Sequence, residues 1–252
     1  MSHLRALIFD VDGTLADTER DAHRVAFNQA FAEFSLPFQW DVPTYGKYLK
    51  ITGGKERLRG FLADHPQYPQ LSATDIRAIH QRKTLIYGEI IAQGVAPLRP
   101  GIHRLLAEAE TAGLRLAIAT TTTPDNVAAL LQSNLGEEGW GRFDYIGAGD
   151  IVPHKKPAAD IYTHVLQRLE LLPGECLALE DSENGLRSAL GAQLPVLITQ
   201  TDYTAGQDFS GALRVLDQLG EPGAPGKVLE GPEAGREVVT DLVLLQHWFT
   251  RG

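Results

Sequence analysis

Short apolar runs alternate with helical patterns along much of the chain. We expect strands over the following ranges: Arg5–Phe9, Leu114–Ala119, Asp144–Ala148, Cys176–Leu179 and Val196–Thr199. Helical patterns follow three of them, over Pro124–Leu135, Ala158–Leu169 and Glu183–Leu190. Continuous apolar runs are typical of buried parallel strands, and strand–helix alternation indicates a doubly wound, Rossmann-like α/β fold. A ligand site in such a sheet lies at the carboxyl ends of the strands.

A long insertion separates the first two predicted strands. Residues 21–34 and 75–92 both have apolar side chains at helical spacing. A crossover between parallel strands needs only about a dozen residues or more, far fewer than the roughly one hundred present. We therefore expect an inserted α-helical cap domain over residues 17–98, and a core domain formed by residues 1–16 plus 99–252.

The return to the core and the C-terminal region have their own signals. The stretch "LRPG" at 98–101 precedes a helical pattern over Ile102–Ala112. Residues 220–235 are rich in Gly, Pro and Glu, which predicts a loop. A final helix is expected over Val238–Phe249.

Composition excludes several classes of protein. The 252 residues carry a net charge of −9, which argues against general binding to nucleic acids or anionic membranes. Cys176 is the only cysteine, so neither an intramolecular disulfide nor a cysteine zinc site can form. No stretch approaches the ~20 apolar residues of a membrane span. We expect a cytoplasmic monomer, or a protein of the plastid stroma if a transit peptide has been removed.

Two carboxylates end the first predicted strand, in "LIFDVDGTL". Asp10 and Asp12 can share one side of an extended chain. Two close carboxylates repel each other unless one is protonated or a cation lies between them. Gly13 then permits a sharp turn. The alternatives are solvated acids at a strand end or a helix cap.

Hydroxyl groups follow the second predicted strand, in "ATTTTPDN". Thr123 suits a helix N-cap and Pro124 the first helical position. Hydroxyls and free helix N–H groups together can hold a phosphate, with Thr120, Thr121 and Thr122 as candidates. A capped turn without a ligand is the alternative.

Charged residues follow the next two strands. Lys156 precedes Pro157, which favours an extended backbone and lets the lysine side chain project from its loop. Glu180 and Asp181 end the fourth strand and add oxygen ligands of the kind that a hard divalent cation takes. Each stretch alone could be a solvated lysine pair or an acidic turn.

The four stretches in this order resemble the haloacid dehalogenase-like superfamily of phosphohydrolases. The resemblance implies that Asp10 is the nucleophile and Asp12 the general acid and base. It also implies that Thr120 and Lys156 bind the transferring phosphoryl group.

The same resemblance implies Mg²⁺ as the cofactor. The ion would be held by the Asp10 carboxylate, the Asp12 backbone carbonyl and Asp181, with Glu180 in or near its coordination shell.

The predicted cap narrows the resemblance to the CbbY-type branch, through "DTERDAHRVAFNQAF" and "KITGGKERLRGFL". That branch is related to β-phosphoglucomutase and hydrolyses xylulose 1,5-bisphosphate to xylulose 5-phosphate. A small phosphorylated sugar is the implied partner, with a second phosphate near Lys55 and Arg57. Further candidates for substrate contact are Glu19, Gly53, Gly54, Lys83 and, more weakly, His23, His80, Thr121 and Thr122.

Several functions remain open on these residues. A sugar phosphomutase of the β-phosphoglucomutase type would use the same chemistry but return the phosphate to the sugar. Phosphoglycolate phosphatase is another relative, and a non-catalytic regulatory module is a remote alternative. For "GGKER", a helix N-terminus with surface charges is the competing interpretation.

Overall fold

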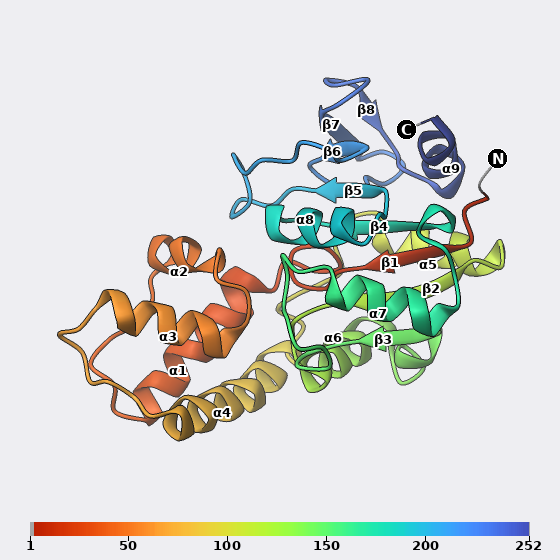
Figure 1. Ribbon diagram of the computed structural model, residues 1–252. Coiled ribbons are helices and arrows are strands. Elements are labelled where there is room, and N and C mark those ends of the chain that lie inside the picture. The colour runs from red at the N-terminus through yellow and green to blue at the C-terminus, as the bar shows by residue number, and fades with distance from the viewer. Residues whose placement is uncertain (1–2, 252) are drawn as a thin grey trace.

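A computed structural model describes residues 3–251 and contains one mixed sheet. Its spatial order is β3-β2-β1-β4-β5-β6-β7-β8, with β1 flanked by β2 and β4 (Figure 1). The strands are β1 Ala6–Phe9, β2 Arg115–Ala119, β3 Tyr145–Gly147, β4 Cys176–Glu180, β5 Val196–Thr199, β6 Arg214–Leu216, β7 Gly226–Glu230 and β8 Glu237–Val238. The first six are parallel, while β7 and β8 add antiparallel pairs at one edge. The predicted doubly wound α/β fold is confirmed.

Helices cover both faces of the sheet, and the twofold alternation of strand side chains explains why. Leu7 and Phe9 join an apolar cluster with α5, α6 and α9, whereas Ala6 and Ile8 join a second cluster with α7 and α8. The core helices are α5 Ile102–Thr111, α6 Pro124–Leu135, η2 Trp140–Arg142, α7 Asp160–Leu169, η3 Pro173–Glu175, α8 Glu183–Gly191 and α9 Leu242–Arg251. Burial on both faces accounts for the continuous apolar runs in the sequence.

The chain between β1 and β2 folds into a group of helices beside the sheet (Figure 1). These are η1 Glu19–His23, a π-helical turn, then α1 Arg24–Glu33, α2 Val42–Leu49, α3 Gly54–Asp64 and α4 Ala73–Ile91. Aromatic rings fill their interior, with Trp40 in contact with Phe27, Phe31 and Phe61. The C-terminal part of α4 packs against α6 and so connects the group to the core. Within residues 3–251, no helix is both long enough and apolar enough to cross a membrane.

The C-terminal prediction was wrong in one respect. Strand β7 lies inside the segment 220–235 that was expected to be a loop, and β6 precedes it unpredicted. Glycine and proline give a strong turn signal locally, but the short run from Gly226 to Glu230 gains backbone hydrogen bonds by joining the sheet edge. The last helix begins at Leu242, four residues later than expected.

Candidate active site

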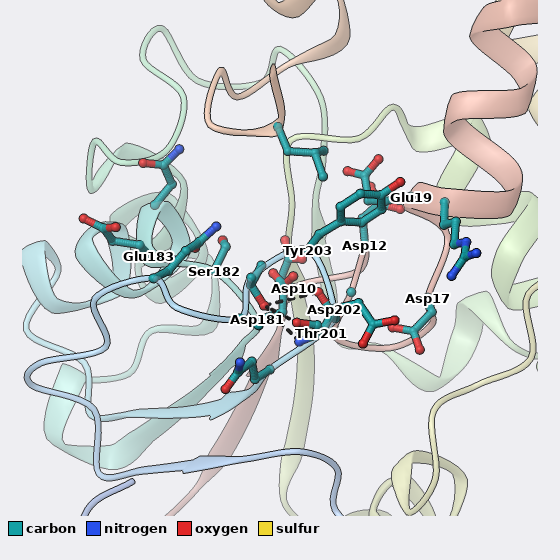
Figure 2. A pocket seen from close by; sticks show the side chains of 18 of the residues that line it. Asp10, Asp12, Asp17, Glu19, Asp181, Ser182, Glu183, Thr201, Asp202 and Tyr203 are labelled. Atoms are coloured by element: carbon teal, nitrogen blue, oxygen red, sulfur yellow. Dashed lines mark hydrogen bonds between the residues drawn. The ribbon is translucent and has the colours of Figure 1, made fainter. Parts of the chain in front are cut away.

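A cleft with a volume of about 950 Å³ lies at the carboxyl ends of the central strands, where the helical group meets the core. Figure 2 shows carboxylates from both parts pointing into it. The sequence-predicted residues that line it are Asp10, Asp12, Glu19, Arg57, Thr120, Thr121, Lys156 and Asp181. Residues from three separate strand ends therefore meet in one place, as parallel strands require.

The end of β1 is set by its pairing with β4. The Asp10 N–H donates to the Leu179 carbonyl over 3.0 Å, which places Asp10 beside the end of β4. Gly13 follows with φ +88°, a left-handed conformation that glycine tolerates best. A Cβ at this position would also overlap the Asp181 carboxylate, so only glycine lets the two loops approach.

Lys156 connects two of these carboxylates. Its Nζ donates to Asp10 Oδ1 over 2.6 Å and to Glu180 Oε1 over 2.5 Å, and all three side chains are buried. The Tyr162 hydroxyl also donates to Glu180 Oε1 over 2.5 Å. Burial raises the pKa of Asp10 to about 8, against the opposing charge of Lys156. Burial lowers the pKa of Lys156, but the charges of Asp10 and Glu180 more than compensate and raise it.

Three buried carboxylates could hold a metal ion. Asp10, Glu180 and Asp181 each offer an oxygen, and these atoms all lie within 4.8 Å of one another. Burial, and then the charges of Asp10 and Glu180, raise the pKa of Asp181 well above its usual value. Glu180 Oε2 is buried without a hydrogen-bond partner. An all-oxygen set with an excess of negative charge fits a hard divalent cation such as Mg²⁺.

Asp12 faces a different environment. Its Oδ1 accepts a hydrogen bond from Thr18 Oγ1 over 2.5 Å and lies 2.8 Å from His23 Nε2. Lys83 Nζ is 2.5 Å from His23 Nδ1, so the three groups form a chain behind the cleft. Burial would raise the pKa of Asp12, but the charge and hydrogen bond of His23 and the Thr18 hydrogen bond lower it to about 2. Burial lowers the pKa of Lys83 to about 8.

The threonines after β2 divide between two places. Thr120 is buried and lines the cleft, and its Oγ1 accepts a hydrogen bond from the Thr122 N–H over 3.2 Å. Thr121 also lines the cleft. Thr122 instead accepts a hydrogen bond from Asn126 of α6 over 2.9 Å, while Thr123 forms the expected N-cap. Thr122 thus connects the loop after β2 to α6 and does not line the cleft.

Glu19 and Arg57 form a linked pair on the opposite side of the cleft. The Tyr45 hydroxyl donates to Glu19 Oε2 and accepts from Arg57 Nη1 over 2.7 Å. Arg57 Nη1 also lies 3.7 Å from Glu19 Oε2. The guanidinium is buried, yet its Nε has no hydrogen-bond partner within the described chain. Arg57 and Glu19 both line the cleft, so one charge of each sign is presented there.

The other cap candidates lie elsewhere in this structure. Lys55 pairs with Asp150 in the loop after β3, and Lys155 joins the same carboxylate over 2.9 Å. Gly53 is the N-cap residue of α3 and Gly54 its first residue, and the His80 ring packs beside Gly54. These four candidates, Lys55, Gly53, Gly54 and His80, are not among the described residues that line the cleft.

Four residues of this region escaped the sequence analysis. Each forms hydrogen bonds to the site. Thr18 donates to Asp12, and Tyr45 links Glu19 with Arg57. Tyr162 donates to Glu180, and Arg99 donates to the Gly13 carbonyl. The sequence could have indicated only Thr18 and Arg99, because Thr18 lies four residues after the motif "DVDGT" and Arg99 lies in "LRPG". The two tyrosines sit in ordinary helical stretches, and only the tertiary structure brings them to the site.

Comparisons with known proteins identify the family of the chain. A family model of haloacid dehalogenase-like hydrolases matches residues 4–193. The chain is 52% identical to the plasmid-encoded protein CbbY of Cupriavidus necator, over 88% of each chain. It is 38% identical to a CBBY-like protein of Arabidopsis thaliana, over 86% of this chain and 70% of that protein.

A solved structure of CbbY from Rhodobacter sphaeroides in complex with phosphate superposes with a TM-score of 0.81. Its sequence is 46% identical, and the match covers 85% of this chain and 94% of that one. A mutant of the same protein was solved in complex with xylulose-(1,5)bisphosphate, at 45% identity and the same TM-score. The chain described here therefore belongs to the CbbY-like branch of the haloacid dehalogenase-like hydrolases and is a phosphatase-type enzyme of that family.

Proposed function

We propose that the chain is a Mg²⁺-dependent sugar-bisphosphate phosphatase that hydrolyses xylulose 1,5-bisphosphate to xylulose 5-phosphate through an aspartyl phosphate. The observation that carries this proposal is that cationic side chains line one cleft on two sides. Lys156 and Thr120 lie with Asp10 on the core side, and the guanidinium of Arg57 lines the cleft on the cap side. The xylulose bisphosphate bound by the Rhodobacter relative supports the same assignment.

In the first step an Asp10 oxygen attacks phosphorus, and the bond between phosphorus and the sugar oxygen breaks. Lys156 and Thr120 stabilise the negative charge on the other phosphoryl oxygens. The leaving alkoxide takes its proton from Asp12, which must itself be protonated at that point. Because Thr18 and His23 keep Asp12 ionised in this state, exchanging those hydrogen bonds for one to the leaving oxygen would raise its pKa.

In the second step water hydrolyses the aspartyl phosphate. The ionised Asp12 removes a proton from that water, so its low pKa suits this half of the reaction. The Asp10–phosphorus bond breaks, and inorganic phosphate and the free carboxylate of Asp10 result.

The carboxylates of Asp10 and Asp181, the backbone carbonyl of Asp12 and, in or near the shell, Glu180 would hold the Mg²⁺ ion. When bound, the ion supplies positive charge that offsets the repulsion between a phosphate dianion and these acids. Its charge would also lower the pKa of Asp10, which burial raises to about 8, and so keep the nucleophile ionised.

We further propose that residues 17–98 act as a cap on a core made of 1–16 and 99–252. Glu19 and Arg57 would then contact the sugar and the distal phosphate, while residues of the core catalyse phosphoryl transfer. Lys55 would reach a substrate only by leaving Asp150. Closure of the cap would exclude bulk water during phosphoryl transfer.

We also propose that the enzyme acts as a monomer in the cytoplasm, or in a plastid stroma as the plant relative suggests. Sedimentation analysis of the purified chain tests the first point, and cell fractionation tests the second.

A screen of sugar monophosphates and bisphosphates, with release of inorganic phosphate as the readout, tests the proposed function. We expect preference for a pentulose bisphosphate, and loss of turnover in Asp10→Asn and after chelation of the metal. Asp125→Asn, an exposed acid in α6, is the matched control. Parental activity in Asp10→Asn, equal turnover of mono- and bisphosphates, or a rearranged sugar phosphate as the product would each contradict the proposal.

A further inference from the structure

A glycine in the middle of α2 has no backbone reason to be there. Gly46 lies four residues into the helix Val42–Leu49 and has helical backbone angles, so a left-handed conformation does not explain it. Glycine inside a helix is less stable than alanine, because it loses more backbone entropy on folding. The space that its missing side chain leaves must therefore serve another purpose.

That space is occupied by a side chain from the core. A Cβ at Gly46 would lie 3.0 Å from both Cδ1 and Cε1 of Tyr203, in the loop that follows β5. This distance is tighter than ordinary van der Waals contact, so the aromatic ring rests directly on the helix backbone. A glycine within a helix need not have such a neighbour, because Gly88 in α4 has no atom within 4 Å of the same position.

Tyr203 also contacts the group of residues that faces the substrate. It lines the cleft and is labelled in Figure 2 with Asp12 and Glu19. Its ring meets the Tyr45 ring edge-on, with centroids 6.1 Å apart and planes at 64°. The Tyr45 hydroxyl in turn bonds Glu19 and Arg57. A continuous series of contacts thus runs from a core loop to the proposed substrate-binding pair.

We propose that Tyr203 is a positioning residue that determines substrate specificity. Its ring packs on the backbone at Gly46 and against the Tyr45 ring. It thereby fixes where Glu19 and Arg57 lie relative to the distal phosphate of a sugar bisphosphate. The proposal rests on the proposed function. The ring makes both contacts, whereas the hydroxyl is buried and has no hydrogen-bond partner among the described residues. The ring alone therefore carries the role.

The chemistry explains why such a contact affects substrate binding. Arg57 and Glu19 belong to the cap, whereas Asp10 belongs to the core, so their separation depends on how the two parts meet. Bidentate and charge-assisted contacts tolerate little displacement. The Tyr203 ring packs against the backbone of α2 and against the Tyr45 ring. These apolar contacts fix the distance between the cap residues and Asp10 without any charged group.

The test compares two substrates in four variants. Xylulose 1,5-bisphosphate spans both ends of the cleft, whereas p-nitrophenyl phosphate reaches only the core groups. Gly46→Ala and Tyr203→Ala should raise KM for the bisphosphate roughly tenfold, since small misplacements of positioning groups cost up to about a hundredfold in rate. Hydrolysis of p-nitrophenyl phosphate should change less than about twofold in both. Tyr203→Phe, which keeps the ring, and Gly88→Ala should match the parent on both substrates.

A double variant checks that the two residues act together. Once the ring is gone, the added methyl of Gly46→Ala has nothing to displace, so Gly46→Ala/Tyr203→Ala should equal Tyr203→Ala alone. Unchanged KM for the bisphosphate in Gly46→Ala, equal losses on both substrates, or fully additive effects would overturn the positioning role.

The two proposals fail in different ways. The inhibition constant of the bisphosphate against p-nitrophenyl phosphate measures its binding even if it is not turned over. Bisphosphate that binds without release of phosphate would contradict the proposed function, while the variants still test Tyr203 through that constant. An inhibition constant unchanged in Gly46→Ala would overturn the positioning role alone.

Discussion

Arg99 is the residue whose loss should destabilise the fold most visibly. It lies in the segment that connects α4 to α5 and is only 8% exposed. Its Nη1 donates to the Gly13 carbonyl and, over 2.7 Å, to the Thr199 carbonyl. Its Nη2 donates to the carbonyls of Gln200 and Asp217 over 2.8 and 2.6 Å. One guanidinium thus joins the loop after β1 to the ends of β5 and β6.

The magnitude follows from these contacts. A hydrogen bond to a charged group contributes about 1.5–3 kcal/mol, so four such bonds set an upper bound of about 6–12 kcal/mol. Water can enter the space left by Arg99→Ala and satisfy some of the carbonyls, which reduces the loss. A buried carbonyl left without a partner costs about 1–3 kcal/mol, so with some of the four rehydrated we expect a loss of about 3–5 kcal/mol.

Urea denaturation followed by circular dichroism measures this loss as a shift in the free energy of unfolding. Arg142→Ala is a matched control, because that arginine makes two bonds of 2.6 and 2.7 Å to Glu110 at the surface. Surface pairs are worth about 0–1 kcal/mol, so the control should shift stability little. If Arg99→Ala destabilised the chain no more than Arg142→Ala does, the interpretation of Arg99 as a buried connector would be wrong.

Three further predictions concern single side chains. Burial, aided by the charge of Lys83, lowers the pKa of His80 from 6.5 to about 3. Below pH 6.5 the imidazole of His80 therefore binds a proton in the unfolded chain but not in the folded one. The free energy of unfolding should fall by about 1–2 kcal/mol between pH 6.5 and pH 5, and His80→Gln should reduce that loss. Identical pH profiles of unfolding for parent and variant would contradict this. Gly13→Ala should abolish activity, because φ is +88° and the new methyl overlaps the Asp181 carboxylate; retained turnover would refute it. Cys176 is fully buried, with its pKa raised by burial to about 12, so a thiol reagent at pH 8 should label it only after unfolding.

The local pattern of the chain predicted much of the fold. The apolar runs at β1, β2, β4 and β5 were recognisable because each strand is buried on both faces and is followed by a turn. The same rule failed for β7, since its short run of five residues has only Val228 and Leu229 as apolar side chains and its pairing depends on β6 and β8 on either side. Its glycine- and proline-rich surroundings gave the stronger signal.

The candidate site was predictable where its residues stand at strand ends. Asp10, Thr120 and Asp181 each follow an apolar run, and parallel strands bring their carboxyl ends to one edge of the sheet. The position of Lys55 within "GGKER" suggested it as a phosphate ligand, yet in this structure its ammonium pairs with Asp150. Because a lysine side chain is long and flexible, its ammonium group can reach several acidic partners, and the sequence does not specify which one it contacts.

By itself the sequence determined the order of the strands from β1 to β5 and of the core helices between them, and which loops carry charged side chains, because these depend on periodicities within a few residues. Only the tertiary structure decided that Lys83 lies behind Asp12 through His23, and that Tyr203 fills the space above Gly46. Those contacts join positions separated by many residues, and no periodicity links such partners. They arise when buried surfaces of two parts of the chain are packed without voids, which is a property of the assembled fold.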